Sequence, residues 1–466
     1  MTTDAENQPQ PKDLFPYLGN NPGKDLARFD IAKPLPPQAV PKPRLVANIG
    51  LHTIPAKPAP PFALLGIAGV PDIIKQLPTP TIMPANLTRC RPDKFSDAFF
   101  VERRLNGFNP GKFNRVTGKE WQYVIRYDCR KYEVDPGGIL PAIIEARFIL
   151  RGKVLYVHSI EYTLREGNNI SNAPVTNSPG DVDWEWAKRL FRSAEFLFQE
   201  TQAHLGRTHL NLEQYAMAYY RNVRNNKIME LLEPHFEGLL NINKEGASII
   251  FGDTGVIPQS SAINTQGVEA MLKEEVSRLN YHTWHPRIQA LQDFVGNNYY
   301  DPAAIAVWEI IEQYVGKFFQ NHKSLIQSDW AEIEGMSQEL VSHSILKPEL
   351  GTLKIRNIND LKKLCVYVIY HASFLHSWVN YKQYEDGGDI EYAALGLWDE
   401  KHPSVKPEDV IKRNISQVLI TWTLSNVKYN PIMENGSPFL KDLLWQRRDE
   451  IQPGLPLESI MMSIHI

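Results

Sequence analysis

The sequence has few cysteines and no long run of apolar residues. Only three cysteines occur among 466 residues, and Cys90, Cys129 and Cys365 lie far apart in the chain. This spacing predicts neither a disulfide framework nor a CxxC metal site, so we expect reduced thiols in the core. No apolar run approaches the roughly 20 residues that a membrane-spanning helix needs. The sequence therefore predicts no transmembrane segment.

Charge of one sign and targeting signals are also scarce. The formal net charge is -3, and the basic residues form no long run, which argues against nucleic acid or an anionic membrane surface as the main partner. The opening residues, MTTDAENQPQ, lack the basic and apolar regions of a signal peptide. We therefore expect a cytoplasmic location. An HExxH motif, which would indicate a zinc hydrolase, is absent as well.

Proline is abundant, and its distribution divides the chain. More than half of the 34 prolines lie between Pro9 and Pro92. Because proline interrupts helices and central strands, residues 1–95 are predicted to form an extended arm. Apolar residues within this stretch predict that the arm packs on a main domain formed by residues 96–466. They are Phe15, Leu18, Leu45, Ile49, Phe62 and Leu64.

The remainder of the chain predicts a mainly α fold. Residues 96–108 have the pattern of an amphipathic helix, and three short strand patterns follow between residues 120 and 163. Residues 182–223 then run without proline and are apolar on most faces, which is typical of a helix at the centre of a large helical protein. Further helices are expected at residues 267–280, 302–321, 328–343, 358–384 and 406–423.

Two histidines in the expected central helix are candidate metal ligands. His204 and His209 are five residues apart in HLGRTH, which separates them by about 140° on a regular α-helix. A π-bulge near Gly206 would bring both imidazoles to one face. Without other residues, the pair is also compatible with two histidines packed in a core.

Further candidate ligands lie near the end of the chain. His376 and Asn380 are four residues apart and share a helix face, whereas His371 and His376 repeat the five-residue spacing, so spacing does not rank these histidines. The chain ends in the apolar segment ESIMMSIHI. If Ile466 is buried, its carboxylate needs a counter-charge, and a metal ion would provide one.

Five segments, in one order along the chain, resemble the catalytic domain of lipoxygenases. They are FSDAFFVERRLNGFNP, the histidine-bearing helix from WAKRLF to YYRNV, LLEPHFEGLLNIN, HSWVNYKQYED and the terminal isoleucine. The resemblance covers most of residues 65–466. It implies a lipoxygenase-like helical fold around a long central helix, with a small β region.

The resemblance also implies a metal site. It assigns His204, His209 and His376 as imidazole ligands, Asn380 as a weak oxygen ligand and the Ile466 carboxylate as the anionic ligand. Glu200 and Gln383 match positions of an outer hydrogen-bond network that orients such ligands. Iron is the expected metal, with manganese as the runner-up, because imidazole and oxygen ligands suit such first-row metals.

The implied reaction is the dioxygenation of a polyunsaturated fatty acid or a similar 1,4-diene lipid. An Fe(III)-hydroxide would take a hydrogen atom from the methylene between two double bonds, and O2 would then trap the radical as a hydroperoxide. Ala262 falls near a position associated with S products. INKEGASII lacks an arginine that pairs the substrate carboxylate in some members, so the resemblance leaves Lys244 as a candidate substitute, tail-first entry of the substrate, or a neutral substrate.

Several departures from the family pattern leave other functions open. Asn225 and Asn226 occupy the place of a His-Pro pair, and the proline-rich arm stands where relatives carry a β-barrel domain, so calcium-dependent membrane docking is not expected. A fatty-acid hydroperoxide isomerase or lyase would keep the same fold and metal. A metal-free lipid-binding protein would keep the fold alone.

Overall fold

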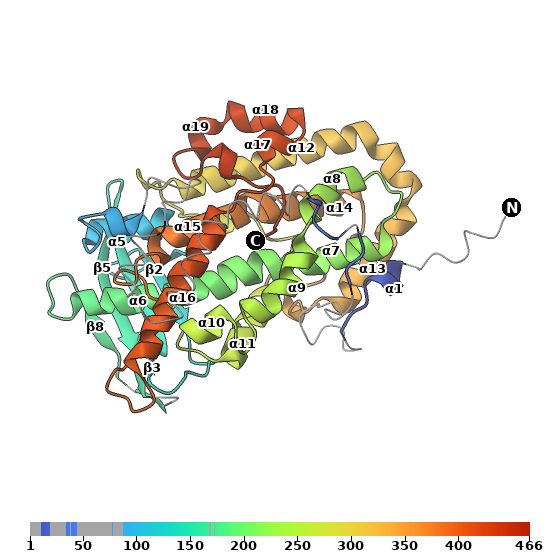
Figure 1. The fold of residues 1–466 in the computed structure, drawn as a ribbon. Coiled ribbons are helices and arrows are strands. Elements are labelled where there is room, and N and C mark those ends of the chain that lie inside the picture. The colour runs from blue at the N-terminus through green and yellow to red at the C-terminus, as the bar shows by residue number, and fades with distance from the viewer. Residues whose placement is uncertain are drawn as a thin grey trace.

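The computed structural model describes most of the chain beyond the arm. The described residues are 11–18, 34–37, 39–43, 77, 87–166, 169–171 and 173–466. Helices make up most of this part, and a small sheet lies at one end of the molecule (Figure 1). The predicted fold class, mainly α with a small β region, is therefore confirmed.

The sheet has five antiparallel strands in the order β1-β2-β4-β5-β8. The strands β2 (Tyr123–Asp128), β4 (Ile143–Arg151) and β5 (Val154–Thr163) correspond to the three predicted strands. Along β2 and β4, buried residues alternate with more exposed ones, because successive side chains of a strand point to opposite faces. The buried face packs against α5 (Asp97–Asn106) and α6 (Trp184–Phe198). The edge strands are β1 (Asn114–Arg115) and β8 (Val175–Asn177).

The predicted central helix is one continuous rod with an unusual middle. It begins as α6, continues as a π-helix, η3 (Gln199–Leu210), and ends as α7 (Asn211–Asn222). Every residue of η3 is buried. The predicted departure from α geometry around Gly206 is therefore confirmed, although it extends over the whole of η3 instead of a single bulge.

Other helices surround this rod. The segment from 358 to 387 packs beside it as α14 (Ile358–Tyr370), a second π-helix, η6 (His371–Leu375), and α15 (His376–Gly387). The other predicted helices are found as α11 (Thr265–Val276), α12 (Tyr300–Ser328), α13 (Trp330–His343) and α16 (Pro407–Asn426). Shorter helices that the sequence did not indicate include α8 (Met229–Phe236), α9 (Leu239–Ile249), α10 (Val256–Ser260), α17 (Ile432–Asn435) and α18 (Pro438–Gln446).

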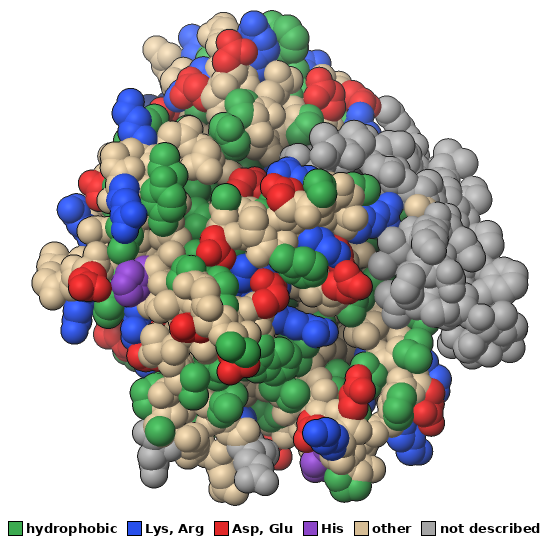
Figure 2. All heavy atoms as spheres, turned by 90° about the vertical axis from the view of Figure 1, so that its left-hand side faces the viewer, with side chains coloured by type: hydrophobic (Ala, Val, Ile, Leu, Met, Phe, Trp, Pro, Cys, Tyr) green, Lys and Arg blue, Asp and Glu red, His purple; other side chains and the backbone are tan. Residues whose placement is uncertain are grey.

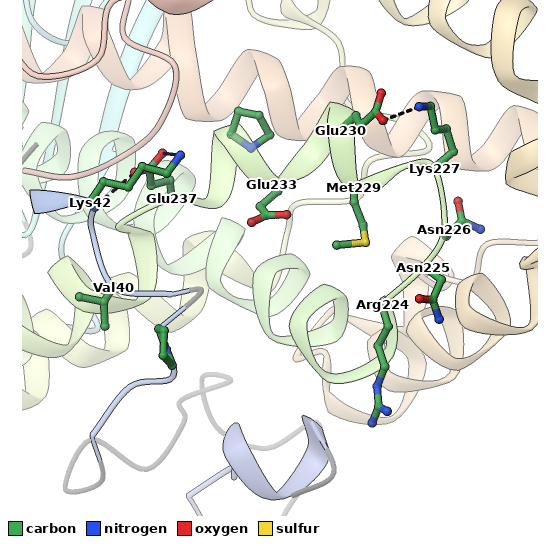
Figure 3. Close-up of a pocket in the computed structure, with 12 residues that line it drawn as sticks. Val40, Lys42, Arg224, Asn225, Asn226, Lys227, Met229, Glu230, Glu233 and Glu237 are labelled. Carbon is green, nitrogen blue, oxygen red and sulfur yellow. Dashed lines mark hydrogen bonds and ion pairs between the residues drawn. The ribbon is translucent and has the colours of Figure 1, made fainter. Parts of the chain in front are cut away.

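The described parts of the proline-rich arm lie against the helices, as far as they extend. Phe15 is buried and stacks on Tyr220 of α7 at a centroid distance of 5.1 Å, whereas Leu18 is exposed. Lys42 pairs with Glu237 across a pocket of about 680 Å³ between the arm and α8 (Figure 3). The other apolar arm residues named above, Leu45, Ile49, Phe62 and Leu64, lie outside the described residues. The division into an arm and a main domain stays a prediction.

The cysteines and the surface bear on the remaining expectations. Cys129 and Cys365 are buried free thiols as predicted, but Cys90 is exposed at the end of the short η2 helix (Thr88–Cys90), so the expectation of a core thiol was wrong there. Acidic and basic side chains are interspersed over the face shown in Figure 2. None of the described helices is both long and apolar enough to cross a membrane.

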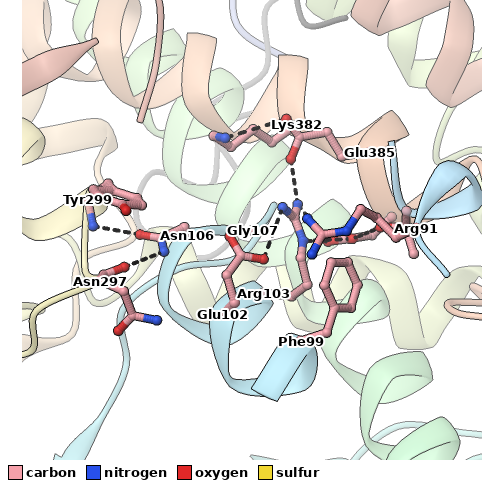
Figure 4. A network of polar contacts seen from close by, with 12 residues as sticks. Arg91, Phe99, Glu102, Arg103, Asn106, Gly107, Asn297, Tyr299, Lys382 and Glu385 are labelled. Carbon is pink, nitrogen blue, oxygen red and sulfur yellow. Dashed lines mark hydrogen bonds and ion pairs between the residues drawn. The ribbon is translucent and has the colours of Figure 1, made fainter. Parts of the chain in front are cut away.

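A buried ionic network joins α5 to α15, the helix that carries His376 and Asn380 (Figure 4). Arg103 contacts the Glu385 carboxylate at 2.5 Å and the Asp386 carboxylate at 2.8 Å, and all three side chains are almost fully buried. The paired carboxylates raise the pKa of Arg103 well above its ordinary value and outweigh the lowering caused by burial. The network thus fixes one end of α15 relative to the sheet.

Replacing Arg103 by methionine should destabilise the protein strongly. Asp386 would stay buried without its cation and Glu385 would keep only the more distant Lys382 ammonium, and breaking a buried pair costs about 3–5 kcal/mol. The free energy of unfolding from a denaturant titration measures this loss. Arg91→Met is the matched control, because Arg91 pairs with Asp93 at the surface, where ion pairs contribute little. Equal stability of the two variants would contradict the role given to the network.

Candidate metal centre

Three buried histidines converge at the middle of the molecule. His204 and His209 come from η3 and His376 from the start of α15, and one ring nitrogen from each lies within 4.8 Å of the others. The ring centroids are 5.0 to 5.3 Å apart. The predicted convergence of these imidazoles is confirmed. Their role as metal ligands stays a prediction.

The wide turn of η3 explains how His204 and His209, five residues apart, can face the same side of the helix. In a π-helix the hydrogen bonds join residues five apart, so His204 and His209 are about one turn from each other and face the same way. Gly206 lies between them, where α11 approaches closely: a Cβ at Gly206 would lie 3.1 Å from the Glu275 Cβ and 3.0 Å from the Thr201 carbonyl oxygen. Gly206 thus suits both the wide turn of η3 and the close packing of η3 against α11.

The second π-helix settles the choice between His371 and His376. His371 is the first residue of η6, and its Nδ1 donates to the Tyr367 carbonyl at 2.8 Å. Its ring packs against Tyr367 and Trp284, with centroid distances of 3.9 and 4.3 Å. Within the described part of the chain, His371 is not a member of the histidine cluster. Of these two residues, therefore, only His376 reaches the cluster.

A polar relay that the sequence analysis missed orients His209. Nδ1 of His209 lies 3.0 Å from Oδ1 of Asn243, and Asn243 Nδ2 donates to a Glu213 carboxylate oxygen at 2.7 Å. Because the carboxylate and the amide oxygen can only accept, His209 must carry its proton on Nδ1. Its Nε2 lone pair then faces the cluster. Asn243 lies in the quoted LLNIN segment, but nothing in its spacing indicated this contact.

Burial keeps two of the three imidazoles, those of His209 and His376, uncharged. It lowers the pKa of His209 to about 3, an effect that the neighbouring His204 increases and that hydrogen bonds to Asn243 and the Ile466 backbone partly offset. Burial also lowers the pKa of His376 well below its ordinary value. The two Nε2 atoms lie 3.2 Å apart, and His204 Nε2 has no hydrogen-bond partner among the described residues. Uncharged imidazoles whose nitrogens face one another fit a shared metal ion.

The other predicted site residues lie beside the histidines. Glu200 Oε2 lies 3.3 Å from His204 Nδ1. Asn380 is fully buried, donates to the Leu424 carbonyl at 2.9 Å and accepts from Gln383 Nε2 at 3.2 Å. Tyr429, which the sequence did not indicate, lies 3.4 Å from His376 Nδ1 through its hydroxyl. His204 and His376, which come from distant segments of the chain, therefore each have a polar partner at Nδ1.

The end of the chain is packed into the same region. Figure 1 places the C-terminus in the middle of the molecule. The predicted burial of Ile460, Met461, Met462 and Ile464 is confirmed, and Ile466 itself is only 8% exposed. A hydrogen bond to the Ile466 backbone raises the pKa of His209 and of His376 against the larger effect of burial. The terminal residue is therefore adjacent to the imidazoles.

A small apolar cavity opens beside the histidines. Its volume is about 50 Å³. Lys244 and Ala262, the two expected substrate contacts, are not among its lining residues. Lys244 lies on α9 between the lining residues Asn243 and Gly246, and Ala262 is buried near Gly138. The lining residues are Glu200, His204, Leu205, His209, Leu210, Ile242, Asn243, Gly246, Ile250, Phe251, Leu424 and Ile466.

Gly238 holds the last turn of the chain in place. It precedes α9 with φ +80°, and a Cβ there would lie 2.3 Å from His465 Nδ1. Gly238→Ala should therefore displace His465 and, with it, Ile466, and we expect a lower metal content in the purified protein. Gly118→Ala is the matched control, because Gly118 has a similar φ of +73° and no atom within 4 Å of the added Cβ. If both variants lost metal to the same extent, the loss would come from backbone strain and not from the displaced terminus.

With this geometry established, comparison with known proteins identifies the family. The lipoxygenase family model matches residues 159–394. The chain belongs to the lipoxygenase family. It is 34% identical over 400 residues to the linolenate 9R-lipoxygenase of Nostoc sp. strain PCC 7120, an alignment that covers 84% of this chain and 49% of the relative.

Other relatives and solved structures agree with this assignment. The human hydroperoxide isomerase ALOXE3 is 24% identical over 383 residues, covering 71% of this chain and 53% of the relative. The crystal structure of a 9R-lipoxygenase from Cyanothece PCC8801 matches with a TM-score of 0.86 and 25% identity over 97% of this chain and 76% of that one. Coral 8R-lipoxygenase shares the fold, with a TM-score of 0.76 at 16% identity, over 98% of this chain and 80% of that one. The chain spans about half the length of the curated relatives it matches.

Proposed function

We propose that this protein is a metal-dependent dioxygenase that inserts O2 into a polyunsaturated fatty acid to give a hydroperoxide. The observation that carries the proposal is the cluster of three buried imidazoles, two of them on the π-helix of a lipoxygenase fold, beside an apolar cavity. The 34% identity to a linolenate 9R-lipoxygenase supports the substrate class.

The donor set favours iron, with manganese as the runner-up. His204, His209 and His376 would supply imidazole nitrogens, Asn380 an amide oxygen and Ile466 a carboxylate, a set without thiolate that suits a first-row metal. A bound iron would supply the one-electron chemistry that removes a hydrogen atom from the methylene between two cis double bonds. Asn380 would serve as the weakest ligand, because Gln383 already donates to its amide oxygen.

The surrounding residues would perform the remaining tasks. Asn243 and Glu213 would hold the His209 ring in one tautomer, and Glu200 and Tyr429 would orient the other two rings. The apolar side chains Leu205, Ile242 and Phe251 would hold the acyl chain and keep bulk water from the radical. Lys244 stays a proposed partner for the substrate carboxylate that would require α9 to move.

Metal analysis and oxygen consumption test this proposal together. Purified protein should contain iron near one equivalent, consume O2 with linoleate or linolenate and produce conjugated-diene hydroperoxide. Oleate, which has a single double bond, should give no oxygen uptake, because it lacks the doubly allylic methylene. Metal-loaded protein that consumes no oxygen with any polyunsaturated acid would refute the proposed function.

A second function, rearrangement of a fatty-acid hydroperoxide, is favoured by the similarity to a hydroperoxide isomerase. It would use the same residues. Supplying a purified hydroperoxide in place of the free acid distinguishes the two functions. Loss of the hydroperoxide without oxygen uptake, together with inactivity on the free acid, would favour the isomerase.

A further inference from the structure

A second, larger cavity lies against the central helix, lined by different residues of η3. Its volume is about 440 Å³. From η3 it is lined by Gln202 and Arg207, whereas His204 and His209 line the small cavity at the metal centre. Gln202 and His204, like Arg207 and His209, are two positions apart and so point to different sides of the helix. The second cavity is therefore separate from the proposed reaction site.

Most charges around the second cavity are already paired. Arg207 donates to a Glu275 carboxylate oxygen at 2.6 and 2.9 Å. Glu274 accepts from Arg278 and from the Tyr132 hydroxyl. Asp128 pairs with Arg130, and Arg126 pairs with Glu145. Among the described basic residues that line the cavity, these pairs leave only the Lys112 ammonium without an acidic partner.

Lys112 is held at the cavity in an unusual way. Its ammonium makes no hydrogen bond or ion pair with any residue that the structure describes, and it lies 5.9 Å from the centroid of the Phe198 ring. With φ of 64°, Lys112 is the one residue other than glycine with a positive φ in the described part of the chain. This conformation costs about 1–2 kcal/mol for a residue with a side chain. The fold therefore maintains a strained position for an unpaired cation.

A second donor at the cavity also lacks an acceptor. The amide Nε2 of Gln202 has no hydrogen-bond partner in the described chain, although Gln202 is only 2% exposed. A buried amide nitrogen without an acceptor is unfavourable by about 1–3 kcal/mol, and a ligand with an acceptor group would remove that penalty. Burial and the nearby Arg207 guanidinium lower the pKa of Lys112 to about 7, so an anion would also stabilise its charged form.

Apolar side chains line one part of the cavity, although polar groups make up the larger share of its exposed lining. Phe113, Phe198, Leu279, Ile288 and the Trp284 ring face the same space. We infer that this cavity binds a carboxylate with an apolar tail, whose oxygens accept from Lys112 and Gln202 while the tail lies on the aromatic and aliphatic side chains. This inference does not depend on the proposed dioxygenase function, because no metal ligand lines the cavity.

Isothermal titration calorimetry with octanoate tests the inference. Octanoate has the carboxylate and the tail but no double bond, so it cannot be turned over. We expect saturable binding of one equivalent. Acetate and inorganic phosphate should bind at least about tenfold more weakly, because they lack a tail, and octan-1-ol should bind more weakly still, because it lacks the charge. Octan-1-ol binding as tightly as octanoate would show an apolar cavity without an anion site.

Variants of Lys112 locate the binding. Lys112→Met and Lys112→Asn should each weaken octanoate binding about tenfold or more, the effect of losing one charge-assisted hydrogen bond. The asparagine variant guards against misfolding, because asparagine tolerates a positive φ. Gln202→Met should weaken binding by a smaller factor. Lys119→Met is the control, because Lys119 is an exposed lysine outside the cavity, and its binding should be unchanged.

Besides equal binding of octan-1-ol, two outcomes would overturn the inference. The first is the absence of octanoate binding to the folded wild-type protein at millimolar concentration. The second is wild-type affinity in both Lys112 variants, which would place the carboxylate elsewhere, for instance at the histidine cavity.

Discussion

Adding a single residue after Ile466 should abolish both metal binding and oxygenase activity while leaving the helical fold intact. The terminal carboxylate would move by up to about 3.5 Å, the reach of one extended residue, whereas ligand distances in a metal site vary by only about 0.2 Å. The apolar residues before it are packed, so the terminus cannot retract to compensate. Deleting Ile466 should have the same effect.

The measurements are metal content, oxygen uptake and the far-ultraviolet circular dichroism spectrum. Ile466→Val is the matched control, because it keeps the carboxylate in place and removes only one methyl group from a residue that is 8% exposed. Its metal content should be close to that of the wild type. An extended protein with full metal content and full activity would count against Ile466 as a ligand, although not against the three histidines.

Replacing His376 by glutamine should lower metal affinity by more than about 100-fold, which exceeds the 10–100-fold effect that is typical of losing an outer hydrogen-bond partner. His376 would contribute one of three imidazoles, and glutamine fills a similar volume without that nitrogen. His371→Gln is the matched control: both histidines are fully buried, both follow α14, and only His376 reaches the cluster.

Competition with a chelator of known affinity measures the difference. The His371 variant should lose some stability, because the Tyr367 carbonyl loses the hydrogen bond from the imidazole Nδ1, but it should retain its metal. Similar metal affinities in the two variants would mean that the cluster does not hold the ion. Loss of metal from the His371 variant alone would reverse the assignment.

Much of the fold was predictable because its signals are local. The strands β2, β4 and β5 alternate in burial, and the long helices have sustained apolar patterns, so their positions agree with the sequence to within a few residues. The short helices α8, α9 and α10 were missed. α8 contains Pro234, and α9 contains Gly246, residues that lower helix propensity, so packing decides their conformation.

The site was predictable where chemistry depends on residue type, and obscure where it depends on contacts between distant segments. His204 and His209 could be paired only by assuming a π turn, which the sequence suggests weakly through Gly206. Asn243 and Tyr429 could not be found, because a single asparagine or tyrosine in an apolar helix or loop has no spacing signal. Spacing likewise did not rank His371 and His376; the resemblance assigned His376, and the structure shows why His371 lies outside the cluster.

The contact between Gly238 and His465 has a consequence for how substrate and metal influence each other. The cavity at the histidines, about 50 Å³, is far smaller than the roughly 300–1,000 Å³ of typical ligand sites. A fatty acid bound there, as proposed, would have to displace part of the cavity wall, and α9 supplies three of the lining residues, Ile242, Asn243 and Gly246.

α9 begins directly after Gly238, which touches the penultimate residue of the chain. Movement of α9 would then alter the positions of both Ile466 and the Asn243 amide that orients His209. Substrate occupancy and metal affinity would be thermodynamically linked. By reciprocity, the factor by which substrate changes the dissociation constant of the metal equals the factor by which the metal changes that of the substrate.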